Sequence, residues 1–129
     1  MRAAGSAEEL RPLPTDRGKL AHVLTHLLEN AIRFSPDGGP IEVLVAGTPA
    51  SVRFRVEDHG FGIPVQEQDR IFEKFYRVDP ELKSGIGGTG LGLYMCRRLT
   101  EQLGGQISVT SCEGEGARFF VEIPRSALD

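Results

Sequence analysis

One glycine-rich stretch of the sequence suggests contact with a phosphorylated ligand. Residues 85–93 read GIGGTGLGL, with five glycines in nine positions, and they run directly into a segment with helical spacing. Glycines allow backbone N–H groups to approach a ligand closely, and the N-terminus of a helix adds positive potential. A chain of phosphates fits such a loop. The alternative is a flexible surface loop that a helix follows.

The spacing of these glycines does not by itself identify the nucleotide. Gly85, Gly87 and Gly90 fit the pattern G-x-G-x-x-G. A dinucleotide site of that pattern directly follows a strand, and residues 77–84 show no strand pattern. A P-loop requires Lys followed by Ser or Thr after the glycines, and a protein kinase requires H-R-D and D-F-G motifs. The chain contains none of these.

An acidic residue at the end of a predicted strand points to the base. Asp58 has the same strand parity as the apolar residues of 52–56, so we expect its side chain on the core side. A buried carboxylate requires a partner, and Gly60 and Gly62 leave space beside it. An adenine amino group that donates to Asp58 would use both the charge and the space. A carboxylate that caps the turn is the equal alternative.

Four residues at helical spacing could serve the rest of a nucleotide. His26, Asn30, Arg33 and Phe34 lie at i, i+4, i+7 and i+8, so one face of a helix carries all four. The amide oxygen of Asn30 suits Mg²⁺, which keeps several waters and phosphates. The guanidinium of Arg33 suits a phosphate, and the ring of Phe34 suits a base. A solvated polar face explains the same spacing without a ligand.

A further cation precedes the glycine-rich stretch. Arg77 follows Phe75 and Tyr76 in a segment, 76–90, that is rich in loop-forming residues. If that segment closes over a ligand, Arg77 reaches a terminal phosphate; otherwise it is a surface residue. The spacing of the Cys and His residues gives no zinc site, and no Ser-His-Asp set stands out.

The hydrophobic pattern predicts the scaffold that positions these residues. The first predicted elements are a helix from Thr15 or Asp16 to a turn at 35–39, and strands around 41–45 and 52–56. A short helix with Ile71, Phe72 and Phe75 follows, and then a helix over 91–103, in which Leu91, Met95, Leu99 and Leu103 are four residues apart. The last predicted elements are strands around 107–109 and 119–123. Strands and helices are grouped rather than alternating. This order predicts an α/β two-layer sandwich, with a mixed, mostly antiparallel sheet of about five strands packed on about three helices.

The composition is that of an ordinary globular domain. The chain has 129 residues, of which 40% are hydrophobic and 26% charged, and a net charge of −3. This balance gives no indication of nucleic acid or of an anionic membrane surface. No apolar run approaches the ~18 residues of a membrane span, and two cysteines are too few for a disulfide framework. We expect one cytosolic domain over 15–129, after a flexible lead-in or cloning remnant at 1–14.

Five stretches together resemble the catalytic and ATP-binding domain of bacterial sensor histidine kinases, in the GHKL superfamily. HLLENAIRFS (26–35) resembles the N box, DHGFGI (58–63) the G1 box, IFEKFYRVD (71–79) the F box, GGTGLGL (87–93) the G2 box and GEGARFFVEIP (114–124) the last glycine box with its strand. The resemblance covers residues 16–124. Each stretch alone is a modest match, whereas all five in this order are highly specific.

The resemblance implies the Bergerat fold, with ATP and Mg²⁺ bound between the helices under a lid at about 78–87. It implies that Asn30 coordinates Mg²⁺ and that Asp58 accepts the adenine amino group. The implied catalytic residues are Arg77, Arg33 and His26. The implied nucleotide-binding residues are Asn30, Arg33, Phe34, Asp58, Gly60, Gly62, Ile63, Tyr76, Arg77, Gly87, Gly88, Thr89, Gly90, Leu91, Gly92 and Leu93. Catalysis would consist mostly of positioning and charge neutralisation.

Two residues depart from the family pattern. The N box often has Asn where this chain has His26, which puts a direct role for that side chain in doubt. The last glycine box often has Thr or Ser where this chain has Ala117, so a hydroxyl that could hold a water in the adenine site is absent. We expect nucleotide binding to survive with altered affinity.

The implied partners are a separate dimerisation and phosphoacceptor domain of the same kinase and a response regulator. The histidines of this chain lack the sequence context of a phosphoacceptor, so we expect a cytoplasmic, monomeric catalytic domain that needs such a partner. The full-length kinase can be anchored in the inner membrane. Two alternatives remain open. One is an anti-sigma-type serine kinase, whose F and G2 boxes match less well, and the other is a non-catalytic nucleotide-binding module.

Overall fold

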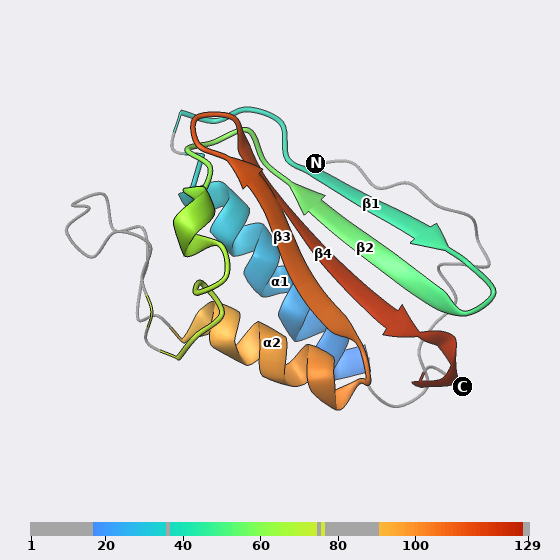
Figure 1. Cartoon of the computed structure of the whole chain (residues 1–129). Helices are drawn as coiled ribbons and strands as arrows, with labels where there is room; N and C mark the ends of the chain where they lie inside the picture. The colour runs from blue at the N-terminus through green and yellow to red at the C-terminus, as the bar shows by residue number, and fades with distance from the viewer. Residues whose placement is uncertain (1–16, 36, 75, 77–90, 128–129) are drawn as a thin grey trace.

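The chain forms two layers, a four-stranded sheet with two α-helices on one of its faces (Figure 1). The computed structural model describes residues 17–35, 37–74, 76 and 91–127. The strands are β1 (Glu42–Gly47), β2 (Ser51–Glu57), β3 (Gln106–Cys112) and β4 (Gly116–Pro124), and the helices are α1 (Arg17–Arg33) and α2 (Gly92–Gln102). The strand order is β1-β2-β4-β3, and every pair is antiparallel. The predicted two-layer α/β sandwich is confirmed.

The apolar alternation of the strands selects the face that the helices cover. Val56 of β2 pairs with Phe119 of β4, and Phe119 also pairs with Val109 of β3. Val56 and Phe119 belong to the buried core, which continues into both helices. On the opposite, open face, Arg53 lies over the ring of Phe120, 4.2 Å from its centroid. The charged residues between the apolar ones therefore face away from the helices, as the period of two requires.

The two helices pack against each other near the middle of α2, where the buried side chains are small. Cys96 is completely buried, and its thiol donates to the backbone carbonyl of Val23 on α1 at 3.8 Å. Thr100, one turn further on, is also buried, and its hydroxyl donates to the Cys96 carbonyl at 2.7 Å. Cys96 therefore has a packing role between the two helices. Burial raises the pKa of this thiol to about 12, so it stays protonated near neutral pH.

The predicted end of α2 is confirmed by its hydrogen bonds. Gly104, with φ of +77°, donates to the Glu101 carbonyl, and Gly105 donates to the Thr100 carbonyl, both at 2.9 Å. This pair of bonds is the Schellman motif, in which glycine takes the left-handed position without a steric penalty. The helix therefore stops at this point and delivers the chain to β3.

The residues that the structure describes contain four strands and two α-helices, which agrees with the approximate expectation of five and three. Two details of the predicted scaffold are wrong. The short helix around Ile71 and Phe72 is a 3₁₀ turn over Val65–Glu67 followed by further turns, with backbone bonds three residues apart. Ile71 and Phe72 are buried as expected, so packing rather than helical periodicity holds this segment.

The second correction concerns Met95 in the apolar line expected along α2. Met95 is 40% exposed, whereas Cys96 and Thr100 form the most deeply buried positions of the helix. Leu99 packs against the core and Leu103 is buried, as the four-residue spacing predicts, so Met95 is the position that departs from the expected line. The helix caps expected at Thr15 and Asp16, and Phe75, lie outside the described residues.

Candidate functional site

The Asp58 side chain lies at the end of β2 and is buried on the helix side of the sheet, as its parity predicts. It is 3% exposed. The Gly60 N–H donates to Asp58 Oδ1 at 2.9 Å, and the Ala117 N–H donates to the same oxygen at 3.3 Å. Both bonds from described groups therefore end on one carboxylate oxygen. Burial raises the pKa of Asp58, and these two hydrogen bonds oppose the rise.

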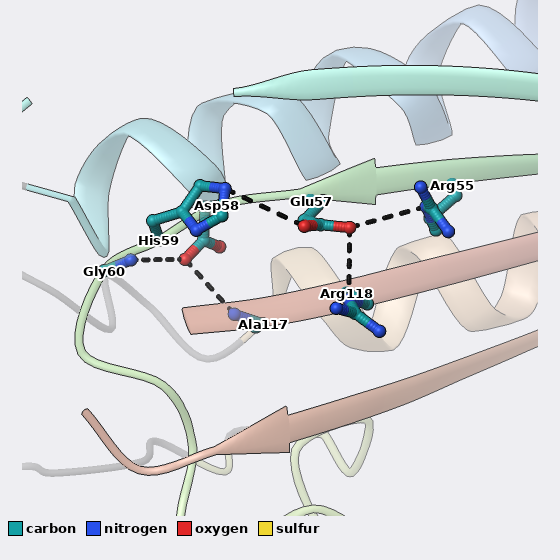
Figure 2. Close-up of polar contacts among 7 residues, drawn as sticks. All are labelled: Arg55, Glu57, Asp58, His59, Gly60, Ala117 and Arg118. Carbon is teal, nitrogen blue, oxygen red and sulfur yellow. Dashed lines mark hydrogen bonds and ion pairs between the residues drawn. The ribbon is translucent and has the colours of Figure 1, made fainter. Parts of the chain in front are cut away.

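The neighbouring acid, Glu57, has a different environment on the open face of the sheet (Figure 2). Its carboxylate pairs with Arg118 at 3.1 Å and Arg55 at 3.5 Å, and lies 3.7 Å from the His59 imidazole. Glu57, His59 and Arg118 border, together with Asp58, a cavity of about 430 Å³ that reaches the β3–β4 turn. Glu57 is thus neutralised by cations of its own chain, which leaves Asp58 as the acid of this pair that can receive a ligand on the helix side.

The segment that we call the Asp58 loop, residues 58–63, is locked by close backbone contacts. A Cβ on Gly60 would overlap the carbonyl of Phe34, and a Cβ on Gly62 would overlap the carbonyl of Cys112. Gly62 also has φ of +73°, which few other residues adopt. The Phe61 N–H donates to the Phe34 carbonyl at 3.0 Å. Both glycines therefore allow the loop to fit between α1 and the β3–β4 turn.

The end of α1 supplies a buried polar group and a ring beside this loop. Asn30 and Phe34 are each 7% exposed, whereas Arg33 is exposed to solvent. The alternative of a solvated polar face is therefore wrong for Asn30 and Phe34 and remains open for Arg33. Within the ranges that the structure describes, no hydrogen bond is recorded to the Asn30 amide. Ser35, which follows Phe34, has a buried hydroxyl for which the described part of the chain supplies no hydrogen-bond partner.

The first residues of α2 meet α1 at a contact that we call the helix junction, formed by His26 and Gly92. A Cβ on Gly92 would overlap three atoms of the His26 imidazole. Burial lowers the pKa of His26, and nearby Arg33 and His22 lower it further against the opposing effect of Glu29. Leu91 forms the N-cap of α2, and Leu93 packs against the core. The imidazole thus occupies the space that the missing side chain of Gly92 leaves.

Tyr76 contacts residues of the turns that follow β2. Its hydroxyl donates to Glu67 at 2.7 Å, and Arg70 lies over its ring at 4.7 Å from the centroid. The hydrogen bond to the Glu67 carboxylate is the main reason that the pKa of Tyr76 is raised. The structure therefore places this residue against the turns over 64–74. The remaining predicted site residues lie outside the described part of the chain: Arg77, Gly87, Gly88, Thr89 and Gly90.

Sequence reasoning missed three polar residues at this site. Gln68 and Ser111 join the Asp58 loop to β3, and Ser35 places its hydroxyl next to Gly60. Neither Gln68 nor Ser111 carries a periodic or motif signal, because each is defined by contacts between segments far apart in the sequence. Ser35 stands at the end of the N-box stretch, but its type alone suits a turn equally well.

The residues present fit one Mg²⁺ ion shared with phosphates. Asn30 offers a buried amide oxygen, which is the hard ligand type that Mg²⁺ prefers. Over the described residues, no group of three or more His, Cys, Asp or Glu side chains could hold a metal by itself. A protein-only metal cage is therefore not seen in this part of the chain, and a shared ion is the arrangement that the donor set suits.

Comparison with known proteins decides the family. A family model described as "Histidine kinase-, DNA gyrase B-, and HSP90-like ATPase" matches residues 15–127. The chain belongs to this family. Of the helices in the described ranges, neither has the length and apolar character needed to cross a membrane.

Similar proteins place the chain near sensor histidine kinases within that family. The alginate biosynthesis sensor protein KinB of Pseudomonas aeruginosa is 42% identical over 117 residues, which cover 91% of this chain and 19% of KinB. The sensor protein kinase WalK of Staphylococcus aureus is 34% identical over 116 residues, which cover 88% of this chain and 28% of WalK. The chain thus spans less than a third of either relative, both of which are larger.

Solved structures agree in fold. The nucleotide-free catalytic domain of histidine kinase ThkA has a TM-score of 0.77 and 32% identity, and the match covers 95% of this chain and 76% of ThkA. Full-length ShkA in complex with AMPPNP has a TM-score of 0.76 and 32% identity, with 90% of this chain and 23% of ShkA covered. The chain is homologous to the catalytic domains of histidine kinases, and its family binds ATP.

Proposed function

We propose that this domain binds Mg-ATP, with the adenine amino group donating to Asp58. The observation that carries this proposal is the buried carboxylate whose recorded bonds both use Oδ1. A second acceptor oxygen on a buried charge favours a donor from a ligand, since an uncompensated carboxylate is costly. Adenine presents such a donor, and Phe34 and Ile63 supply apolar surface near the loop.

The phosphates then extend from the Asp58 loop toward the helices. Asn30 contributes the protein oxygen for Mg²⁺, which when bound neutralises phosphate charge. Leu91 and Gly92 present backbone N–H groups at the start of α2, where the helix dipole favours an anion. Arg33 is exposed and can turn toward a phosphate. Arg77 and the lid at about 78–87 complete the proposed site by resemblance to the family.

The proposed reaction is transfer of the γ-phosphate to a histidine on a separate dimerisation and phosphoacceptor domain, followed by relay to a response regulator. The sensor kinases to which this chain is similar are several times longer than the chain, which supports a multidomain setting. Positioning and charge neutralisation supply most of the catalysis in phosphoryl transfer. We place this domain in the cytoplasm, where ATP is available.

Calorimetry with AMPPNP, with and without Mg²⁺, tests nucleotide binding. We expect AMPPNP to bind, to bind more tightly when Mg²⁺ is added, and to bind about 100-fold more weakly to Asp58→Asn. Absence of heat from the folded wild-type domain under both conditions would overturn the proposal.

Phosphotransfer is tested by mixing the domain and γ-labelled ATP with a histidine-kinase phosphoacceptor domain. We expect label on the acceptor that is lost in acid, because phosphohistidine is acid-labile. Acid-stable label would support the serine-kinase alternative instead. Label on this domain alone would contradict the need for a separate acceptor.

A further inference from the structure

Gln68 joins two segments that are far apart in the sequence. Its side-chain nitrogen donates to the Ile63 carbonyl at 2.9 Å and to the Ser111 carbonyl at 2.8 Å. Both partners are carbonyl oxygens, so the amide NH₂ fits here and the amide oxygen does not. Both hydrogens of the Gln68 amide are therefore engaged in hydrogen bonds. The side chain therefore links the end of the Asp58 loop to strand β3.

Ser111 completes the link from the other side. Its hydroxyl accepts from the Ile63 N–H at 2.8 Å and donates to the Gly116 carbonyl at 2.6 Å. The N–H of Ile63 is thus held by Ser111 directly, and the C=O of Ile63 is held to Ser111 through Gln68. Because the Ile63 side chain is also buried in the core, this residue is fixed through its backbone and its side chain.

The opposite end of the Asp58 loop is fixed by β4. The Asp58 N–H donates to the Ala117 carbonyl at 2.9 Å, and the Ala117 N–H returns a bond to the Asp58 carboxylate. A Cβ on Gly116 would overlap the Asp58 carbonyl, so the contact allows no side chain there. The loop is therefore tied at Asp58 by β4 and at Ile63 by β3, and Gln68 contributes two of the bonds at the second tie.

We propose that Gln68 is a positioning residue that gives the site its preference for adenine over guanine. This inference rests on the proposed function. Adenine presents an amino donor to the Asp58 carboxylate, whereas guanine presents a carbonyl oxygen at the same ring position. Discrimination between them depends on holding the carboxylate at a fixed place relative to Ile63. When the tie at Ile63 loosens, adenine loses a contact that guanine does not make.

Three variants test this role. Gln68→Met keeps the length of the side chain and removes both donors, whereas Gln68→Lys keeps donors that can reach two carbonyls. Gln66→Met is the matched control, because Gln66 lies exposed on the same turn. AMPPNP and GMPPNP affinities are measured by calorimetry with Mg²⁺, and far-UV circular dichroism checks the fold.

We expect Gln68→Met to weaken AMPPNP binding by about tenfold and GMPPNP binding by less than about twofold, the scale of two lost neutral hydrogen bonds. Gln68→Lys and Gln66→Met should bind AMPPNP within about threefold of wild type. Equal loss of affinity for both nucleotides in Gln68→Met would indicate a merely structural role and overturn the inference. AMPPNP binding unchanged from wild type would overturn it as well.

A variant that does not fold is covered by a second pair. If Gln68→Met does not fold, the inference fails unless Gln68→Lys folds and still prefers AMPPNP over GMPPNP while Ser111→Ala loses that preference. Failure of wild type to bind AMPPNP would instead refute the proposed function.

Discussion

The Asp58 loop and the helix junction are held by different means. In the Asp58 loop, backbone N–H groups of 58–63 bond to the residue after α1, to β3 and to β4, and C=O groups bond to Gln68 and to the β3–β4 turn. Glycines permit this close contact because they have no side chains. At the helix junction, the imidazole of His26 fills the space above Gly92. One region is thus defined by the backbone of the sheet, and the other by two side-chain positions on separate helices.

This difference predicts where change is tolerated. A loop that is tied by backbone bonds keeps its shape when a side chain is exchanged for one of equal size, so a substitution there alters chemistry more than geometry. At the helix junction, the size of one residue sets the space for the other, so substitutions are coupled. The following predictions are ordered from the largest expected effect to the smallest.

Asp58→Asn should separate chemistry from geometry in the Asp58 loop. The amide can still accept from Gly60 and Ala117, but its NH₂ then faces the donor of adenine. We expect AMPPNP affinity to fall by about 100-fold in calorimetry, on the scale of a lost charged hydrogen bond and an unpaired donor. The melting temperature should stay the same or rise, because a buried charge is removed.

Asp69→Asn provides the control for loss of one negative charge, since Asp69 is exposed on a turn. It should bind AMPPNP as wild type does. A large drop in the melting temperature of Asp58→Asn would show that the carboxylate holds the loop together and does not chiefly serve a ligand.

Gly92→Ala should reveal the coupling at the helix junction. The new methyl group displaces the imidazole or the start of α2, so we expect AMPPNP affinity to fall by about 30-fold. His26→Ala in the same chain creates room and should recover affinity to within about fivefold of wild type. Calorimetry on both single variants and the double variant completes the cycle.

Gly18→Ala is the matched glycine control, because a Cβ there meets nothing within 4 Å. It should leave binding unchanged. A double variant that binds as weakly as Gly92→Ala would mean that Gly92 is required by the ligand and not by His26.

Asn30→Ala should affect the metal rather than the base. With Mg²⁺ present, we expect AMPPNP affinity to fall by about tenfold, because the proposed protein ligand of the ion is removed. Without Mg²⁺, affinity should change by less than about twofold. Glu29→Ala, at an exposed neighbouring position, should retain the full response to Mg²⁺. An equal loss in both conditions would refute the metal role.

The pH dependence of binding should follow Asp58. Its pKa is raised above the usual value of 3.8, so the folded chain binds a proton there more tightly than the unfolded chain does. Above the folded pKa, the ionised Asp58 carboxylate therefore lowers the free energy of unfolding. This destabilisation disappears as pH falls through the folded pKa. AMPPNP affinity should fall over the same pH window by about fivefold, since a neutral acceptor is weaker. Asp58→Asn should abolish this step in calorimetric titrations.

Much of the scaffold could be predicted because the period of the apolar residues and the parity of side chains along a strand depend on nearby residues. Alternation of apolar residues predicted strand β2, and strand parity predicted the burial of Asp58 on the core side. The spacing of apolar residues predicted the extent of α2 to within one residue at each end. These features depend on neighbours within a few residues.

The rest of the site depends on contacts between distant segments. The turns over 64–74 follow from the burial of Ile71 and Phe72 against strands that come later in the sequence. The bonds of Gln68 to Ile63 and Ser111, and the contact of His26 with Gly92, join residues whose types alone indicate no partner. Such pairings require the three-dimensional arrangement, because many polar residues could satisfy the same local pattern.

The two cysteines give the domain a built-in position for a spectroscopic probe. Cys96 is buried with a pKa of about 12, so thiol reagents at neutral pH should pass over it. Cys112 is exposed, and its carbonyl lies against Gly62 of the Asp58 loop. A fluorophore on the natural sequence would therefore sit beside the proposed base pocket, so the arrival of a nucleotide could be followed in real time without introducing a cysteine.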